Sequence, residues 1–274
     1  MKVIITLTTV PSRLNSESHN HDIRRCIESL VNQDYVGDYE VHFNIPTRNH
    51  KTQELYVVPD WLRTLSITNP KLKLFEGLED KGTLTKLFYT LQRESDPSSI
   101  IVVCDDDLVY HPKMLQEHVK NQGLHTNTAI GYDGLRAERE TPEDVARLRG
   151  DKRDHYVVSV THNIFVNVLQ HYKTVSYKRS YFGEDFFEFI NLGSWNDDIT
   201  VSAYLTKNQI KKMVAVYEFE KQLHSLEDWQ TFGGVTTFPV LAHTRHDSNE
   251  GCNLYRQERV DDGHMKFYQL GYLK

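Results

Sequence analysis

The chain has 274 residues, a formal net charge of −6, 39% hydrophobic residues and 26% charged residues, a composition that is typical of a folded globular protein and excludes a disordered chain. The mildly acidic balance argues against non-specific binding to nucleic acid. The sequence contains no run of about 18 apolar residues, so we expect no membrane-spanning helix. The three cysteines lie far apart, so we expect neither a disulfide framework nor a cysteine-based zinc site, and the sequence favours a cytoplasmic protein.

The first half of the chain alternates predicted strands with predicted helices. Apolar runs predict strands at 3–7, 41–45, 72–75 and 100–103, and apolar side chains at helical spacing predict helices at 23–31, 52–66 and 84–91. The run at 100–103 is apolar throughout, as expected for a strand buried on both faces of a parallel sheet. The alternation predicts an open, mostly parallel sheet with helices on both sides, whose ligands bind beyond the carboxyl ends of the strands.

The second half of the chain is less regular. Its pattern predicts strands at 156–160, 164–169 and 212–217, a helix that opens at Asn196, and a charged surface helix and loop at 136–154. We expect the aromatic side chains at 181–189 to lie in the core rather than in a platform for sugar stacking. With no repeat and no clear linker, residues 1–274 are expected to form a single domain.

Three consecutive acids follow the apolar run that ends at Val103. Asp105, Asp106 and Asp107 would repel one another at this position unless a cation lies among them. Hard oxygen ligands suit Mg²⁺ or Mn²⁺, and the D-x-D spacing lets Asp105 and Asp107 reach one ion. The alternative is a turn with a cap for the helix predicted near 112–119, for which one Asp would suffice. The sequence therefore favours a cation site here.

A second pair of acids, Asp197 and Asp198, lies at a predicted helix start. One of them could act as the helix cap, because acids favour the positive end of a helix. A carboxylate at this place also stays ionised and has a fixed direction, which suits a general base. Both interpretations remain open from the sequence.

Basic and histidine side chains supply further candidates. Lys81 and Lys86 flank another helix start at Gly82, where free N–H groups could bind a diphosphate, although an ordinary helix start is the alternative. His243 and His246, late in the chain, could supply a metal ligand or be plain polar residues.

Six segments carry a resemblance to a known family through their order and spacing. They are TLTTVPSR at 6–13, IESLVNQ at 27–33, DKGTLTKL at 80–87, VVCDDD at 102–107, YKRSYF at 177–182 and NDDITVSAYL at 196–205. Together they resemble the inverting, family-2-like group of GT-A glycosyltransferases, over about residues 2–215.

The resemblance implies an α/β fold of the GT-A type, with a Rossmann-like, mostly parallel sheet flanked by helices and a smaller mixed sheet on the acceptor side. Residues 1–125 would form the half that binds the nucleotide sugar, and residues 126–274 the acceptor-binding half and C-terminal tail. The roles implied are donor binding for Thr8, Thr9, Arg13, Lys81, Lys86, Asp105 and Asp106, metal binding for Asp105, Asp107 and His243, and general base for Asp198 or, as the alternative, Asp197.

The implied activity is a metal-dependent transfer of a sugar, with Mn²⁺ or Mg²⁺ as cofactor, from a nucleotide-sugar donor to a hydroxyl of a glycan or glycoconjugate. A UDP-sugar is the expected donor, and inversion of the anomeric centre is the expected outcome. One alternative is a sugar nucleotidyltransferase, although residues 8–13 lack the glycine-rich loop that such enzymes commonly need. Another is a non-catalytic module that binds a sugar or a cation, although no EF-hand pattern is present.

Overall fold

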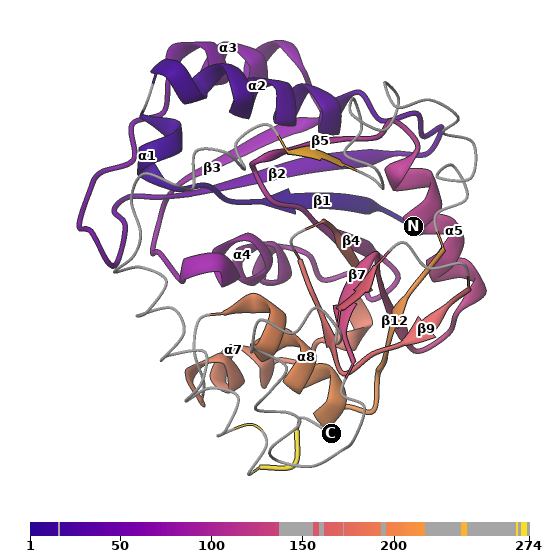
Figure 1. Cartoon of the computed structure of the whole chain (residues 1–274). Helices are drawn as coiled ribbons and strands as arrows, with labels where there is room; N and C mark the ends of the chain where they lie inside the picture. Colours follow the sequence, from indigo (N-terminus) through magenta and orange to yellow (C-terminus); the bar gives the residue numbers. More distant parts are fainter. Residues whose placement is uncertain are drawn as a thin grey trace.

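The largest feature of the fold is a sheet of eight strands (Figure 1). The computed structural model describes residues 1–15, 17–136, 156–158, 162–171, 173–192, 196–216, 237–239, 267 and 270–272. In spatial order the strands are β3 (Leu72–Leu78), β2 (Tyr39–Pro46), β1 (Val3–Leu7), β4 (Ile100–Val103), β11 (Val175–Lys178), β6 (Thr128–Gly131), β12 (Lys211–Val214) and β9 (Ile164–Phe165). The first four strands are mutually parallel, β6 and β12 are parallel, and β11 and β9 run antiparallel to their neighbours. The predicted mostly parallel sheet is confirmed.

Two smaller sheets accompany the main one in the described part of the chain. They are the three-stranded sheet of β10 (Val168–Leu169), β7 (Asp133–Leu135) and β8 (Tyr156–Val158), and the pair of β5 (Leu108–Tyr110) with β13 (Thr237–Pro239). The resemblance implies a smaller mixed sheet, whereas the strand pairs in both small sheets are antiparallel. The prediction of a single strand at 164–169 is wrong, because the chain changes its partner strand within this segment. The N–H of Val166 donates to the carbonyl of Lys212, whereas the N–H of Asn167 donates to the carbonyl of Leu135.

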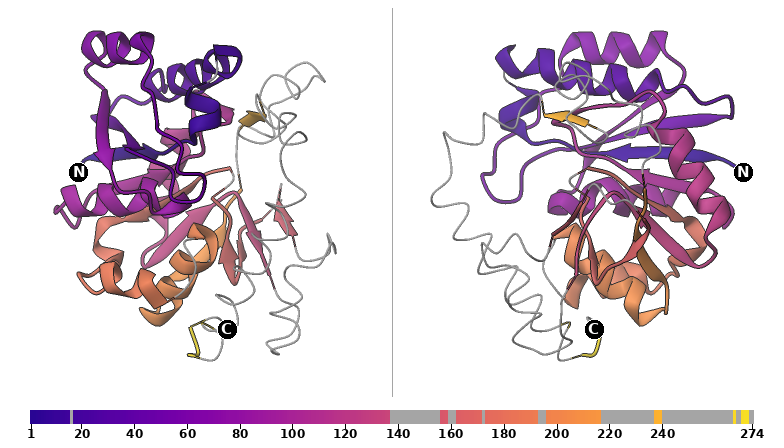
Figure 2. Two further views of the ribbon diagram at one scale, coloured as in Figure 1. Left: turned by 90° about the vertical axis from the view of Figure 1, so that its left-hand side faces the viewer. Right: turned by 45° about the vertical axis from the view of Figure 1, so that its right-hand side comes forward.

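Helices cover both faces of the main sheet (Figure 1). They are α1 (Pro11–Leu14), α2 (Glu17–Val31), α3 (Asp60–Thr68), α4 (Thr85–Arg93), α5 (Met114–Leu124), α7 (Phe186–Phe189) and α8 (Asp197–Lys207), with 3-10 turns η1 (Gly82–Leu84), η3 (Arg179–Tyr181) and η4 (Ile190–Leu192). Figure 2 shows α2 and α3 at one end of the molecule and the orange helices α7 and α8 at the other. None of the helices in the described ranges combines the length and apolar character that crossing a membrane requires.

Proline positions explain where two helices begin. The helix predicted at 52–66 begins only at Asp60, because Pro59 holds an extended backbone (φ −72°, ψ 151°) and the residue before a proline avoids the helical region. Pro11 opens α1, where its missing N–H costs no hydrogen bond. Strand β1 ends earlier, at Leu7.

The core has two main halves, one on each face of the sheet. On β4, Ile100 and Val102 pack with side chains of α2 and α5, whereas Ile101 and Val103 pack with side chains of α4 and α8. This alternation explains why every residue of the strand is apolar. The aromatic residues predicted to be core are buried at Tyr181, Phe182, Phe186 and Phe189, and Phe187 packs against them.

The register of the central strands positions the candidate site. Strands β1 and β4 are parallel neighbours, with Thr6 opposite Val103. The segments that follow them, 8–13 and 104–107, therefore leave the sheet side by side at its carboxyl edge, where open α/β sheets bind their ligands.

Candidate functional site

Arg13 ties the loop after β1 to the acids after β4. Its guanidinium donates to a carboxylate oxygen of Asp106 and, at 3.1 Å, to Oδ2 of Asp107. The hydroxyl of Thr9 donates to the other oxygen of Asp106 at 2.5 Å. Burial alone would lower the pKa of Arg13, but the neighbouring carboxylates outweigh it and raise that pKa, so the guanidinium stays charged.

Lys86 joins the first of the three acids to helix α8. Its ammonium, only 3% exposed, lies 2.6 Å from Oδ1 of Asp105 and 2.7 Å from Oδ2 of Asp197. Burial opposes its charge, but the two carboxylates raise the pKa of Lys86 above its usual value. Burial would raise the pKa of Asp197, yet Lys86 and then His171 hold it below its usual range. For Asp105 the effect of burial is larger than that of Lys86, so the pKa of Asp105 is raised above its usual value.

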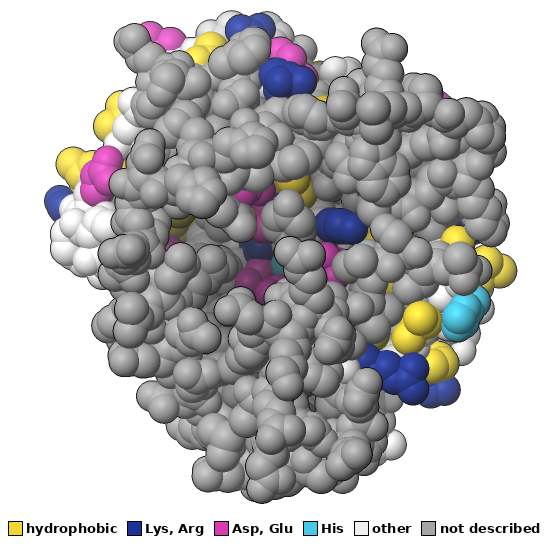
Figure 3. Space-filling view, in the orientation of Figure 1, with side chains coloured by type: hydrophobic (Ala, Val, Ile, Leu, Met, Phe, Trp, Pro, Cys, Tyr) yellow, Lys and Arg dark blue, Asp and Glu magenta, His cyan; other side chains and the backbone are white. Residues whose placement is uncertain are grey.

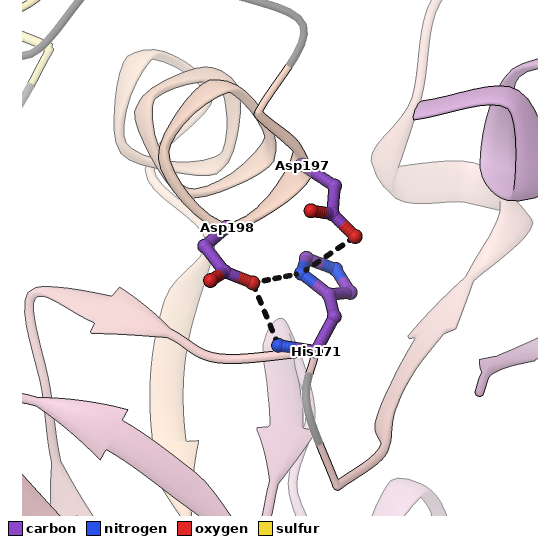
Figure 4. Close-up of side chains that lie close together, drawn as sticks. All are labelled: His171, Asp197 and Asp198. Atoms are coloured by element: carbon purple, nitrogen blue, oxygen red, sulfur yellow. Dashed lines mark hydrogen bonds and ion pairs between the residues drawn. The ribbon is translucent and has the colours of Figure 1, made fainter. Parts of the chain in front are cut away.

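The first turn of α8 presents two carboxylates in different environments. The side chain of Asn196 caps the helix by accepting the N–H of Ile199 at 3.1 Å, so neither acid is needed as the cap. Asp197 turns toward Lys86, and its side chain is 6% exposed. Asp198, with a side chain 26% exposed, turns toward His171 instead (Figure 4).

His171 is a member of the site that the sequence analysis did not single out. Its backbone N–H donates to Oδ1 of Asp198 at 2.7 Å, and its Nδ1 lies 2.8 Å from the same oxygen (Figure 4). No spacing pattern links His171 to an acid 27 residues later, so the only signal in the sequence is a polar residue just before a strand. With Asp197 and Asp198 it forms a group whose ligand atoms lie within 4.8 Å of one another, close enough to share a metal ion.

The site holds more negative than positive side chains. Five carboxylates, those of residues 105, 106, 107, 197 and 198, face two strongly basic side chains, Arg13 and Lys86. Figure 3 shows acidic, basic and histidine side chains gathered near the middle of one face. An excess of carboxylate oxygens is the donor set that Mg²⁺ and Mn²⁺ prefer, so the residues present fit such an ion.

Asp133, at the start of β7, is a second residue that the sequence did not indicate. It is 6% exposed, and within the described part of the chain its Oδ1 has no hydrogen-bond partner. Burial, together with the charge of Asp198, raises its pKa to about 7, although Lys173 lowers it.

The remaining predicted residues lie at its margin or outside the described residues. The hydroxyl of Thr8 donates to the carbonyl of Asn44 at 2.8 Å. The ammonium of Lys81 pairs with Glu79 at 2.7 Å. The N–H of Gly82 donates to Asp80, so it is already engaged within the chain. His243, His246 and the stretch 137–155 lie outside the described residues.

Comparisons with known proteins give fold-level likeness only. No protein-family model matches the chain, and no curated protein matches it. One similar solved structure is S. aureus TarS 1–349, with a TM-score of 0.47, 11% identity and coverage of 79% of this chain and 58% of that one. Another is the mannosyltransferase PcManGT from Pyrobaculum calidifontis in complex with GDP-Man and Mn2+, with a TM-score of 0.46, 15% identity and coverage of 99% and 70%. This chain thus spans less than two thirds of the TarS chain. Both TM-scores are below 0.5, so the function proposed below rests on the geometry of the site.

Proposed function

We propose that the chain is a metal-dependent, inverting glycosyltransferase of the GT-A, family-2-like group that uses a nucleotide-sugar donor, with a UDP-sugar as the first candidate. The observation that carries this proposal is the excess of five carboxylates over two basic side chains at the carboxyl edge of a parallel sheet. Such a site suits a divalent cation and, through it, a diphosphate. Residues 1–125 supply the donor half, and residues 126–274 supply the acceptor half.

The acids after β4 are the proposed donor and metal residues. Asp107 and Asp105, with His243 as an additional ligand, would hold Mn²⁺ or Mg²⁺. When bound, the ion would neutralise charge that develops on the leaving diphosphate. Thr9 and Arg13 fix the direction of Asp106, and Lys86 fixes that of Asp105, so this set of oxygens is preorganised before any ligand arrives.

Asp198 is the proposed general base. Asp197 is poorly suited, because Lys86 lies 2.7 Å from its Oδ2 and its pKa is held below the usual range. Asp198 is more exposed than Asp197, and in Figure 4 its second oxygen points away from His171. That oxygen would take the proton of the acceptor hydroxyl as the new C–O bond forms and the bond to the diphosphate breaks. A single displacement of this kind inverts the anomeric centre.

The experiment that tests this proposal compares Asp198→Asn with wild type and with the surface control Asp38→Asn. Release of nucleoside diphosphate is measured over a panel of UDP- and GDP-sugars, acceptor glycans and Mn²⁺ or Mg²⁺. We expect D198N to lower kcat by ~10²–10⁴ while donor affinity is retained, and D38N to match wild type. Release of pyrophosphate from a sugar phosphate and a nucleoside triphosphate would support the nucleotidyltransferase instead. Binding of donor by wild type without turnover on any acceptor would contradict transfer.

The metal assignment has its own test. Titration calorimetry with Mn²⁺ and UDP is carried out on wild type, Asp107→Asn and D38N. We expect D107N to lose the affinity for both ligands, because its amide cannot replace a carboxylate as an anionic ligand. Unchanged affinity in D107N would show that the acid cluster is only a turn.

A further inference from the structure

A chain of hydrogen bonds reaches Asp198 from the interior of the protein. Oδ1 of Asp198 lies 2.8 Å from Nδ1 of His171, and Nε2 of His171 lies 2.6 Å from the hydroxyl of Tyr177. His171 is 1% exposed and Tyr177 is 0% exposed, so water does not compete for these bonds. Tyr177 belongs to β11 in the main sheet, which makes it a rigid anchor.

The direction of each bond follows from the chemistry of its groups. An ionised carboxylate can only accept, so Nδ1 of His171 must carry the proton that it donates to Asp198. In the neutral form of the imidazole with its proton on Nδ1, Nε2 accepts and the hydroxyl of Tyr177 donates. Burial, with the charges of Asp197 and Asp198, raises the pKa of Tyr177 well above its usual value, so the phenol keeps this proton.

The two N–H groups of His171 both bond to one oxygen of Asp198, while Nδ1 also lies 3.6 Å from Oδ2 of Asp197 (Figure 4). The backbone N–H and Nδ1–H both donate to Oδ1 of Asp198, at 2.7 and 2.8 Å. Oδ2 points away from His171 in Figure 4. Lys86 pairs instead with Asp105 and Asp197. The carboxylate of Asp198 is therefore held through Oδ1, and Oδ2 is left on the side away from His171.

We propose that His171 is a positioning residue for the general base, anchored at Nε2 by Tyr177, and that it fixes Asp198 so that Oδ2 meets the acceptor hydroxyl. This inference rests on the proposed function, in which Asp198 is the base. The alternative role for the same side chains is direct ligation of a cation by His171, Asp197 and Asp198. The two roles exclude each other at Nδ1, because a metal would have to replace the proton there.

The kinetic test uses three variants: His171→Leu removes both side-chain bonds of His171, His171→Asn is designed to restore only the bond to Asp198, and Tyr177→Phe removes only the bond to Tyr177. His171→Leu removes the Nδ1 donor but keeps the backbone N–H, and we expect kcat to fall by up to ~10² while the KM for the donor stays unchanged. His171→Asn places an amide N–H where Nδ1–H was, so it is expected to restore most of kcat. Tyr177→Phe keeps the ring and removes the hydroxyl, and an intermediate kcat is expected. A H171L variant with wild-type kcat, or a H171N variant no better than H171L, would overturn the inference.

A measurement without turnover separates this inference from the proposed function. The ¹⁵N NMR signals of His171, assigned by their loss in H171N, report which ring nitrogen carries the proton. We expect the Nδ1–H form in wild type and also in Tyr177→Phe, because the carboxylate of Asp198 still accepts the proton of Nδ1. An Nε2–H form in wild type would overturn the inference. If wild type turns over no donor, the proposed function fails, and the NMR result still decides the hydrogen-bond chain.

A metal titration decides between positioning and ligation. Mn²⁺ alone is titrated by calorimetry into wild type and H171L. Equal affinity in the two proteins is expected if His171 positions Asp198. A loss of Mn²⁺ affinity in H171L would assign the residue to a metal site and overturn the inference.

Discussion

At the scale of single residues, Lys86 is the cation on which two carboxylates depend. Replacement by methionine would leave Asp105 and Asp197 facing each other without a counter-charge. Removing one partner from a buried ion pair typically costs about 3–5 kcal/mol, so we expect Lys86→Met to lower the free energy of unfolding by that order. Urea unfolding at pH 7 measures the effect, with Lys113→Met at an exposed position as the control. A K86M variant as stable as K113M would show that Lys86 does not compensate the two acids.

The residues of the site were predictable to different degrees. The acids at 105–107 and 197–198 and the basic residues Arg13 and Lys86 stand next to predicted strand ends and helix starts, so the sequence indicates them. Their pairing was not predictable, because Lys86 meets Asp197 only after α4 and α8 pack on the same face of the sheet. His171 and Asp133 carry no local signal, since their role depends on contacts with side chains distant in the sequence.

At the scale of elements, the N-terminus of α8 decides the direction of both candidate bases. Asn196 caps this helix through Ile199, and the N–H of Asp197 donates to the hydroxyl of Thr83 at 3.1 Å. Loss of an N-cap side chain typically costs about 1 kcal/mol, which is the decrease in unfolding free energy that we expect for Asn196→Ala. Asn196→Ser retains a capping oxygen and should stay close to wild type. Urea unfolding of both variants tests this, and equal stabilities would argue against the cap.

The prediction of helices and strands succeeded where the apolar runs are unambiguous. It failed where the bounds of a strand depend on which other strands it pairs with. The buried strands at 3–7 and 100–103 and the helix stripe at 84–91 are confirmed, because burial on fixed faces leaves a clear periodicity. The strand at 164–169 divides between two sheets, which depends on the partner strands and not on its own sequence. Strands β5 and β13 have three residues each, too few to show a period.

At the scale of the whole molecule, two buried ionisable groups shape the dependence of stability on pH. Burial raises the pKa of Asp133 from 3.8 to about 7, so the folded state binds more protons than the unfolded state between these values. The free energy of unfolding therefore falls as pH rises through this range. Burial lowers the pKa of Lys212 from 10.5 to about 8, so the unfolded state binds more protons between those values, and stability rises with pH there.

Between pH 7 and pH 8 both groups are charged in the folded protein, so each lowers stability in this range. Asp133→Asn removes the first cost and is expected to stabilise the protein by up to about 4 kcal/mol at pH 8, with no gain near pH 4. Lys212→Met removes the second, with a gain of up to about 3 kcal/mol at pH 7 that shrinks as pH rises above 8. Urea unfolding of both variants at pH 4.5, 7.5 and 9.5 measures these opposite trends. The carboxyl and the ammonium are expected to give opposite pH dependences. A gain in unfolding free energy that does not change with pH, in either variant, would show that its effect comes from packing and not from charge.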